Sequence, residues 1–121
     1  TKQAEEAIAS RLSYETLDQQ LHMRVAEYLR LQNRVPKIEQ IATALHISSR
    51  TLQRQLNHRN LSFKKIVEIE RMKRCEQLLL QNMSLTEIAI SLGYSDQSAL
   101  ARAYKAYSGQ TLLQRKQQLK E

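Results

Sequence analysis

Two stretches of the sequence carry mostly arginine, glutamine and serine at matching positions. They are Ser49, Arg50, Gln53 and Arg54 in the first stretch, and Gln97, Ser98, Ala101 and Arg102 in the second. An arginine guanidinium can donate to both O6 and N7 of guanine, and a glutamine amide pairs in a similar way with adenine. The small Ala101 could only touch a thymine methyl group. Placed on exposed helix starts, these side chains have the chemistry needed to contact base edges in a major groove.

A second group of residues could bind the phosphate backbone instead of the bases. Its members are Thr51, Lys64, Lys65, Thr86 and Lys105. Hydroxyl and ammonium groups donate to phosphate oxygens, as do the backbone amides at helix starts, here near Ile38 and Leu85. For each lysine, an ordinary solvated surface charge is the alternative that the sequence leaves open.

The charge distribution favours a polyanionic partner. The 121 residues hold 19 Lys and Arg against 12 Asp and Glu, which gives a net charge of +7. Residues 34–121 hold fifteen bases and seven acids, whereas residues 1–33 hold four bases and five acids. The positive excess therefore lies entirely in the later part of the chain, where it predicts a basic surface. The first stretch has no acid between residues 48 and 60. We therefore expect it to attract a polyanionic partner more strongly than the second stretch does.

Both stretches belong to an internal repeat. Residues 38–48 match residues 85–95 at an offset of 47, and the offset becomes 48 beyond the serines. Each copy has the apolar spacing of a short helix, then a turn, then a second amphipathic helix, which is the helix-turn-helix layout. Gly93 and its counterpart His46 both tolerate the positive φ that the turn favours.

Apolar spacing and capping residues predict the elements around the repeat. Helices are expected over residues 16–32, 37–45, 48–57, 62–81, 84–92, 96–107 and 111–119, after a short helical stretch at 4–12. Thr16 to Gln19 form a capping-box pattern, so the first main helix is expected to begin there. No stretch alternates like a strand, which predicts an all-α fold.

The helix over residues 62–81 has two apolar faces and is expected to be a spine between two subdomains. We therefore expect residues 1–15 to be a linker or accessory helix, 16–61 the first helix-turn-helix subdomain, 62–82 a linker helix, and 83–121 the second subdomain. Acids on the spine lie among Lys and Arg at helical spacing, which predicts surface ion pairs. These acids are Glu68, Glu70 and Glu76. Asp96 is expected to cap its helix or to pair with Arg71.

Several other kinds of site are excluded by residue type and spacing. His22, His46 and His58 lack metal-ligand spacing, and Cys75 has no second cysteine. A single cysteine forms no internal disulfide, which indicates a reducing compartment. The two glycines lie too far apart for a phosphate-binding loop, and no apolar run approaches the length of a membrane span. We expect no enzyme activity, no cofactor, no metal and no membrane partner.

The repeat carries a longer and more specific pattern. The first copy reads Ile41-Ala42-x-x-Leu45-x-Ile47-Ser48-x-Arg50-Thr51-Leu52-Gln53-Arg54-x-Leu56, then Ser62-Phe63. The second reads Ser84-Leu85-x-Glu87-Ile88-Ala89-x-x-Leu92-Gly93-Tyr94-Ser95-Asp96-x-Ser98-Ala99-Leu100-x-Arg102-Ala103-Tyr104-Lys105, then Gly109. From about Val35 to Lys116 the sequence resembles the C-terminal DNA-binding domain of the AraC/XylS family of bacterial transcription regulators.

The resemblance implies a fold of about seven helices, with two helix-turn-helix subdomains joined by a long linker helix. It implies sequence-specific binding to double-stranded promoter DNA, with the two second helices in adjacent major grooves, and it supports the same outward base-reading positions. It further implies contact with RNA polymerase, activation of transcription, and a location in the cytoplasm at the bacterial nucleoid. We expect this fragment to be monomeric, with dimerisation of a longer protein through an N-terminal domain left open.

The sequence departs from the family pattern at several positions. His46 and Asn60 stand where the family often has glycine, and both residue types tolerate positive φ. Leu112 replaces a usual proline and Arg115 an aromatic residue, which leaves the start and packing of the last helix open. The alternative function is that of a helical protein–protein interaction module without DNA binding.

Overall fold

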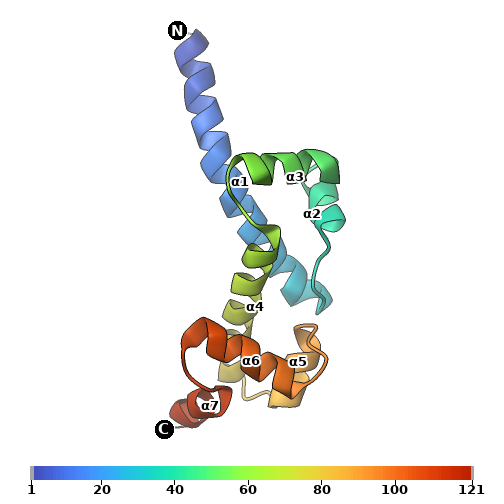
Figure 1. Cartoon of the computed structure of the whole chain (residues 1–121), viewed down its shortest axis with the longest axis vertical. Helices are drawn as coiled ribbons and strands as arrows, with labels where there is room; N and C mark the ends of the chain where they lie inside the picture. The colour runs from blue at the N-terminus through green and yellow to red at the C-terminus, as the bar shows by residue number, and fades with distance from the viewer. Residues whose placement is uncertain (1, 121) are drawn as a thin grey trace.

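The computed structural model describes residues 2–120, and the side chains of residues 17–120. Seven helices make up this part of the chain: α1 (Lys2–Gln32), α2 (Ile38–Ala44), α3 (Ser49–His58), α4 (Phe63–Leu80), α5 (Leu85–Ser91), α6 (Gln97–Ser108) and α7 (Leu112–Lys120). They lie along α4, with α2 and α3 towards one end and α5, α6 and α7 at the other (Figure 1). The predicted all-α class, with two helix-turn-helix units joined by a long helix, is confirmed.

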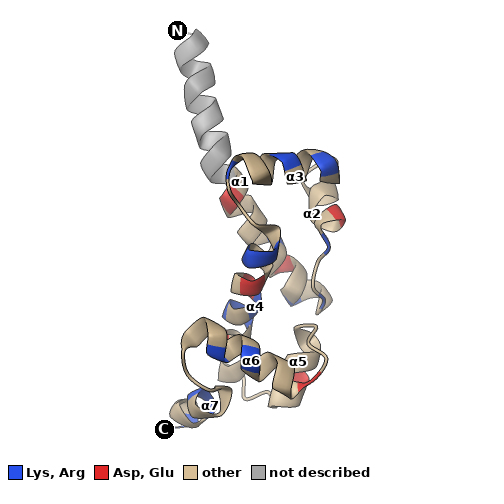
Figure 2. Cartoon of the chain, in the orientation of Figure 1, with Lys and Arg blue, Asp and Glu red and all other residues tan. Residues whose placement is uncertain are grey.

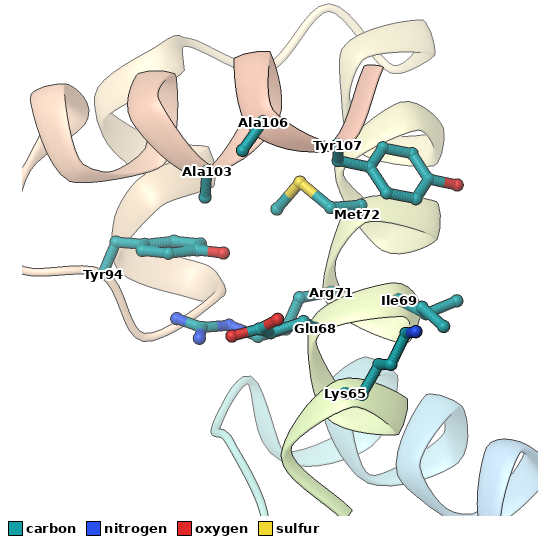
Figure 3. A pocket seen from close by; sticks show the side chains of 9 residues that line it. All are labelled: Lys65, Glu68, Ile69, Arg71, Met72, Tyr94, Ala103, Ala106 and Tyr107. Atoms are coloured by element: carbon teal, nitrogen blue, oxygen red, sulfur yellow. The ribbon is translucent and has the colours of Figure 1, made fainter. Parts of the chain in front are cut away.

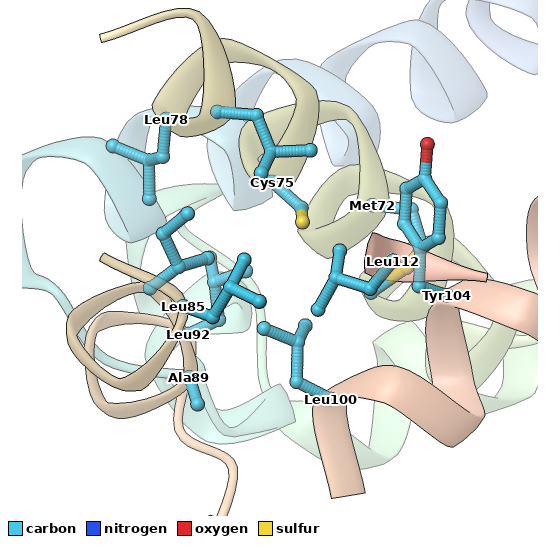
Figure 4. Packing of buried hydrophobic residues seen from close by; sticks show 11 residues of the cluster. Met72, Cys75, Leu78, Leu85, Ala89, Leu92, Leu100, Tyr104 and Leu112 are labelled. Carbon is cyan, nitrogen blue, oxygen red and sulfur yellow. The ribbon is translucent and has the colours of Figure 1, made fainter. Parts of the chain in front are cut away.

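Each end of α4 lies in its own hydrophobic core. The first lobe is the part built around Leu17, Leu21, Val25, Leu29, Ile41, Ala42, Leu52, Leu56, Ile66 and Val67. The second lobe is built around Met72, Cys75, Leu78, Leu79, Leu85, Ile88, Ala89, Leu92, Leu100, Tyr104 and Leu112, which Figure 4 shows converging between α4, α5, α6 and α7. Because α4 supplies buried residues to both lobes, the prediction that this helix is a spine is confirmed.

The two helix-turn-helix units share the same backbone pattern in their turns. The amide of Ile47 donates to the carbonyl of Ala42 at 3.0 Å, and the amide of Tyr94 donates to that of Ala89 at 2.9 Å. His46 has φ of 61° and Gly93 has φ of 81°. Both the internal repeat and the expected positive φ at these turns are therefore confirmed at atomic detail.

Polar side chains satisfy the free amides at the starts of the helices. Ser48, Ser62 and Ser84 accept hydrogen bonds from the amides of Thr51, Lys65 and Glu87. Asp96 accepts from the amide of Ala99 at 2.8 Å, so of its two expected roles it takes the capping one. The start of α7, left open by the sequence, is a capping box in which the Thr111 amide donates to Gln114 Oε1 and the Gln114 amide donates to Thr111 Oγ1.

One expectation for the helices was wrong, and a second holds only in part. The first main helix does not begin at Thr16, because α1 runs without a break from Lys2 to Gln32. The ion pairs expected along α4 form only in part. Glu70 pairs with Lys73 on the same helix, whereas Glu76 bonds to Tyr104 on α6 and Arg115 on α7.

The Glu70 carboxylate is buried and lies at the contact between α1 and α4. His22 Nδ1 lies 2.7 Å from Glu70 Oε2, and Lys73 Nζ lies 3.3 Å from the same oxygen. Glu76 accepts hydrogen bonds from the Tyr104 hydroxyl and from Arg115 Nε, the latter at 3.2 Å. These two carboxylates therefore link α4 to α1, α6 and α7 through polar contacts between helices.

Candidate nucleic-acid interface

Helix α3 presents its predicted base-reading residues on one outward face. Leu52 and Leu56 are buried in the first lobe, which turns the opposite side of the helix towards solvent. Arg50, Gln53 and Arg54 are exposed, and Ser49 is half-buried at the first helical position. The structure therefore places the three long side chains of the first set together on an open surface.

Helix α6 is arranged in the same way in the second lobe. Leu100 and Tyr104 are fully buried, while the predicted readers Gln97, Ser98 and Arg102 are exposed. Ala101 is half-buried and packs against the second core, so it offers less free surface than the other three. Among the predicted readers, α6 thus exposes one arginine, whereas α3 exposes two.

The cations on these two helices are not engaged by other groups. Within the described residues, Arg50, Arg54, Arg102 and Lys105 make no ion pair and no side-chain hydrogen bond. Blue bands mark Lys and Arg on the faces of α3 and α6 in Figure 2. Unpaired exposed cations are electrostatically available to an anionic partner, because no internal carboxylate competes for them.

The two helices lie at opposite ends of α4 and cross the view of Figure 1 in the same direction, one above the other. The sets predicted from the repeat are therefore brought to two separate places along one molecule.

The predicted phosphate-binding residues differ in how free their polar groups are. Lys64, Lys65 and Lys105 are exposed, the first two in the opening turn of α4. The Thr51 hydroxyl accepts a hydrogen bond from Ser48 Oγ at 2.9 Å and so belongs to the cap of α3. Thr86 Oγ1 lies 3.5 Å from Gln97 Oε1, a long contact that brings a predicted phosphate ligand beside a predicted reader.

Arg71 on α4 reaches the second helix-turn-helix unit, a role that sequence reasoning missed. Its Nε donates to the carbonyl of Leu92 at 2.9 Å, and its guanidinium lies 3.7 Å from the centre of the Tyr94 ring. Figure 3 shows the two groups stacked at the edge of a hollow between α4 and α6. Burial lowers the pKa of Arg71, while Tyr94 and Glu68 raise it. Burial also raises the pKa of Tyr94, against the lowering effect of Arg71.

Among the described residues, no group of three or more His, Cys, Asp or Glu could hold a metal ion. None of the described helices combines the length and apolarity needed to cross a membrane. The Cys75 thiol is buried, and that burial, with a smaller effect from Glu76, raises its pKa to about 12. It is therefore a protonated core residue at neutral pH.

The fold and the exposed cationic second helices define a tandem helix-turn-helix protein. Residues 41–118, more than half of the chain, match a protein family described as a helix-turn-helix domain. Over 74 residues the chain is 40% identical to the HTH-type transcriptional regulator VirS of Mycobacterium tuberculosis, which covers 60% of this chain and 22% of that protein. The chain thus spans about a fifth of the length of this relative.

Solved structures give the same picture. The transcriptional regulator CdpR from Pseudomonas aeruginosa superposes with a TM-score of 0.67 and 30% identity, over 80% of this chain and 31% of that one. A DNA-binding transcriptional dual regulator from Escherichia coli K-12 has a TM-score of 0.73 at 20% identity, over 84% of this chain and 90% of that one, and shows the shared fold.

The chain belongs to the AraC/XylS-type family of helix-turn-helix transcription regulators. Its helix-turn-helix units are those of the DNA-binding domain of such a regulator. Membership of this family favours DNA binding over the protein–protein interaction module that the sequence left open. The family is one of DNA-binding transcription regulators.

Proposed function

We propose that the chain binds a promoter by placing α3 and α6 in adjacent major grooves on one face of the duplex. The observation that carries this proposal is the pair of exposed cationic helices at opposite ends of α4. A helix fits the major groove of B-DNA, and two readers on one side of a protein meet that groove again after one helical turn.

In this proposal the outward side chains of both helices contact base edges. The readers are Ser49, Arg50, Gln53 and Arg54 on α3, and Gln97, Ser98, Ala101 and Arg102 on α6. The arginines supply donors for guanine and Gln53 and Gln97 supply amides for adenine. The first helix contributes more to affinity, because two of its readers are arginines and only one reader of α6 is.

Phosphate contacts hold the domain in register. Lys64, Lys65 and Lys105 contribute exposed ammonium groups, and Thr51 and Thr86 contribute hydroxyls beside the helix starts. Such contacts add affinity on any sequence and make it depend on salt, because each one releases a bound counterion.

We also propose where the regulator acts and what it contacts. It acts as an activator in the bacterial cytoplasm, at the nucleoid, and presents a surface to RNA polymerase. The fragment is monomeric, while the longer protein has the option of dimerising through an N-terminal domain. Residues 1–15 form a linker or accessory segment, 16–61 and 83–121 the two DNA-binding subdomains, and 62–82 the linker helix, which agrees with the two separate cores.

The test measures binding to a duplex that the wild-type chain enriches from a random pool. Arg54→Ala and Arg102→Ala each remove one proposed base contact, so each is expected to cost about 1–3 kcal/mol and to relax base preference only at its own half-site. Lys65→Ala is expected to weaken binding equally on all sequences and to reduce the salt slope by about one unit.

Arg30→Ala is the matched control. Arg30 is exposed near the end of α1 and lies outside both readers, so its loss removes the same charge without a proposed contact. We expect this variant to keep the base preferences of the wild type. If Arg54→Ala and Arg102→Ala bind the enriched duplex as the wild type does, the assignment of α3 and α6 as readers is wrong.

A further inference from the structure

Two contacts made by half-buried residues fasten the turn of the second helix-turn-helix unit to the rest of the molecule. In the first, half-buried Arg71 bonds to the Leu92 carbonyl and stacks on half-buried Tyr94 (Figure 3). Leu92 and Tyr94 flank Gly93, so this contact holds the turn itself. A guanidinium that is both stacked and hydrogen-bonded has a fixed orientation, which a flexible ammonium would not have.

The second contact comes from the first lobe. Val35, in the link between α1 and α2, packs against the core of the first lobe and also reaches Gly93. A Cβ placed on Gly93 would lie only 2.8 Å from Val35 Cγ2, so the side chain sits directly against the glycine backbone. The turn of the second unit is thus held between α4 on one side and the α1–α2 link on the other.

We propose that these contacts, made by Val35, Arg71 and Tyr94 around Gly93, form an inter-lobe joint that fixes the separation and twist of α3 and α6. The joint thereby makes the domain selective for the number of base pairs between its two half-sites. This inference rests on the proposed function, since spacing matters only when both helices read the same duplex.

The geometry of DNA makes such a joint measurable. Each added base pair moves a half-site by about 3.4 Å along the axis and turns it by roughly 35°. If α3 and α6 are held rigidly, they cannot adjust to this displacement, so one helix leaves its half-site and the gain in affinity from two-site binding is lost. If the joint is loosened, the two helices can adjust in part, and the domain then tolerates altered spacing.

The first experiment compares affinities for the enriched duplex and for versions with one or two base pairs inserted or deleted between its half-sites. We expect the wild type to lose about tenfold or more in affinity for altered spacing, as two-site binding becomes one-site binding. Arg71→Met and Tyr94→Leu are expected to reduce this loss to about threefold or less, with unchanged affinity for a duplex bearing one half-site.

Arg74→Met is the matched control, because Arg74 is also on α4 and bonds to Gln77 of the same helix instead of the turn. It removes the same charge and should keep the spacing preference of the wild type. If Arg71→Met and Tyr94→Leu keep the spacing preference of the wild type, the proposed joint is wrong. The same holds if the affinity of the wild type does not depend on spacing. A wild type that binds two half-sites no better than one would instead contradict the proposed function.

A second experiment tests the joint without DNA. Spin labels on Thr43→Cys in α2 and Glu87→Cys in α5, both exposed positions, report the distance between the lobes. Cys75 is buried and protonated, so it should stay unlabelled. A narrow distance distribution that broadens with Arg71→Met supports the joint, and an equally narrow distribution in the variant overturns it.

Discussion

Replacing Gly93 by alanine tests whether the close packing of the lobes is real. Gly93 has φ of +81°, a conformation that costs an L-residue about 1–2 kcal/mol. The new Cβ would also lie 2.8 Å from Val35 Cγ2, closer than real Cβ atoms approach other heavy atoms. Overpacking of this kind costs about 1–3 kcal/mol, so Gly93→Ala should destabilise the fold by about 2–5 kcal/mol.

The chain contains a matched control for the conformational part of this cost. Gly109 has φ of +82° and nothing lies within 4 Å of the Cβ it would gain. Gly109→Ala should therefore cost only about 1–2 kcal/mol. The Val35→Ala change should rescue Gly93→Ala, because the next nearest atoms, Arg71 Nη2 and Val35 Cβ, both lie at 3.8 Å, an ordinary contact distance.

The assay is urea unfolding at 25 °C followed by circular dichroism. The wild type, Gly93→Ala, Val35→Ala and the double variant form a double-mutant cycle, and Gly109→Ala is measured beside it. We expect a coupling free energy of about 1–3 kcal/mol between positions 35 and 93. If Gly93→Ala costs no more than Gly109→Ala, and Val35→Ala gives no rescue, Val35 does not pack against the turn and the reasoning is refuted.

Two further outcomes follow from the buried groups of α4. His22→Ala should lower the free energy of unfolding by about 1–3 kcal/mol, because it removes the 2.7 Å partner of the buried Glu70 carboxylate; urea unfolding would show this, and an unchanged midpoint would contradict it. Cys75 should resist alkylation in the native chain and react once the chain is unfolded, since burial raises its pKa from 9.0 to about 12. The unfolded thiol ionises first, so stability should fall as pH rises from about 9 towards 12, and less steeply in Cys75→Ala; identical slopes would count against this assignment.

The repeat is the reason that so much of the fold follows from the sequence. Leu52 and Leu100 are equivalent in the two copies, and both are fully buried in the structure. Serine and aspartate caps gave the helix starts to within a residue or two, because a cap is a local interaction between a side chain and an amide close in sequence. The exposure of Arg54 and Arg102 follows from the same periodicity.

The features that sequence reasoning missed depend on contacts between distant residues. Lys73 lies three residues from Glu70 and predicted a surface pair, yet the nearer partner of Glu70 is His22, 48 residues away in the sequence. The partners of Arg71 lie 21 or more residues away, at Leu92 and Tyr94, so helical spacing carries no signal for them. Only the folded structure brings these groups together.

The start of α1 was missed for a different reason. A capping box marks a helix start only where the chain before it leaves the helix, and residues 2–32 contain neither glycine nor proline to end one. The pattern from Thr16 to Gln19 was therefore compatible with a helix interior, and α1 continues through it.

The most direct measurement of the central proposal is the selection of bound duplexes from a random pool by the wild-type chain. Two exposed readers at the ends of one spine predict an enriched site with two short conserved blocks, separated by about one helical turn. A single enriched block, or a pool that remains random while binding persists at low salt, would contradict the proposal that α3 and α6 both read the bases of one duplex.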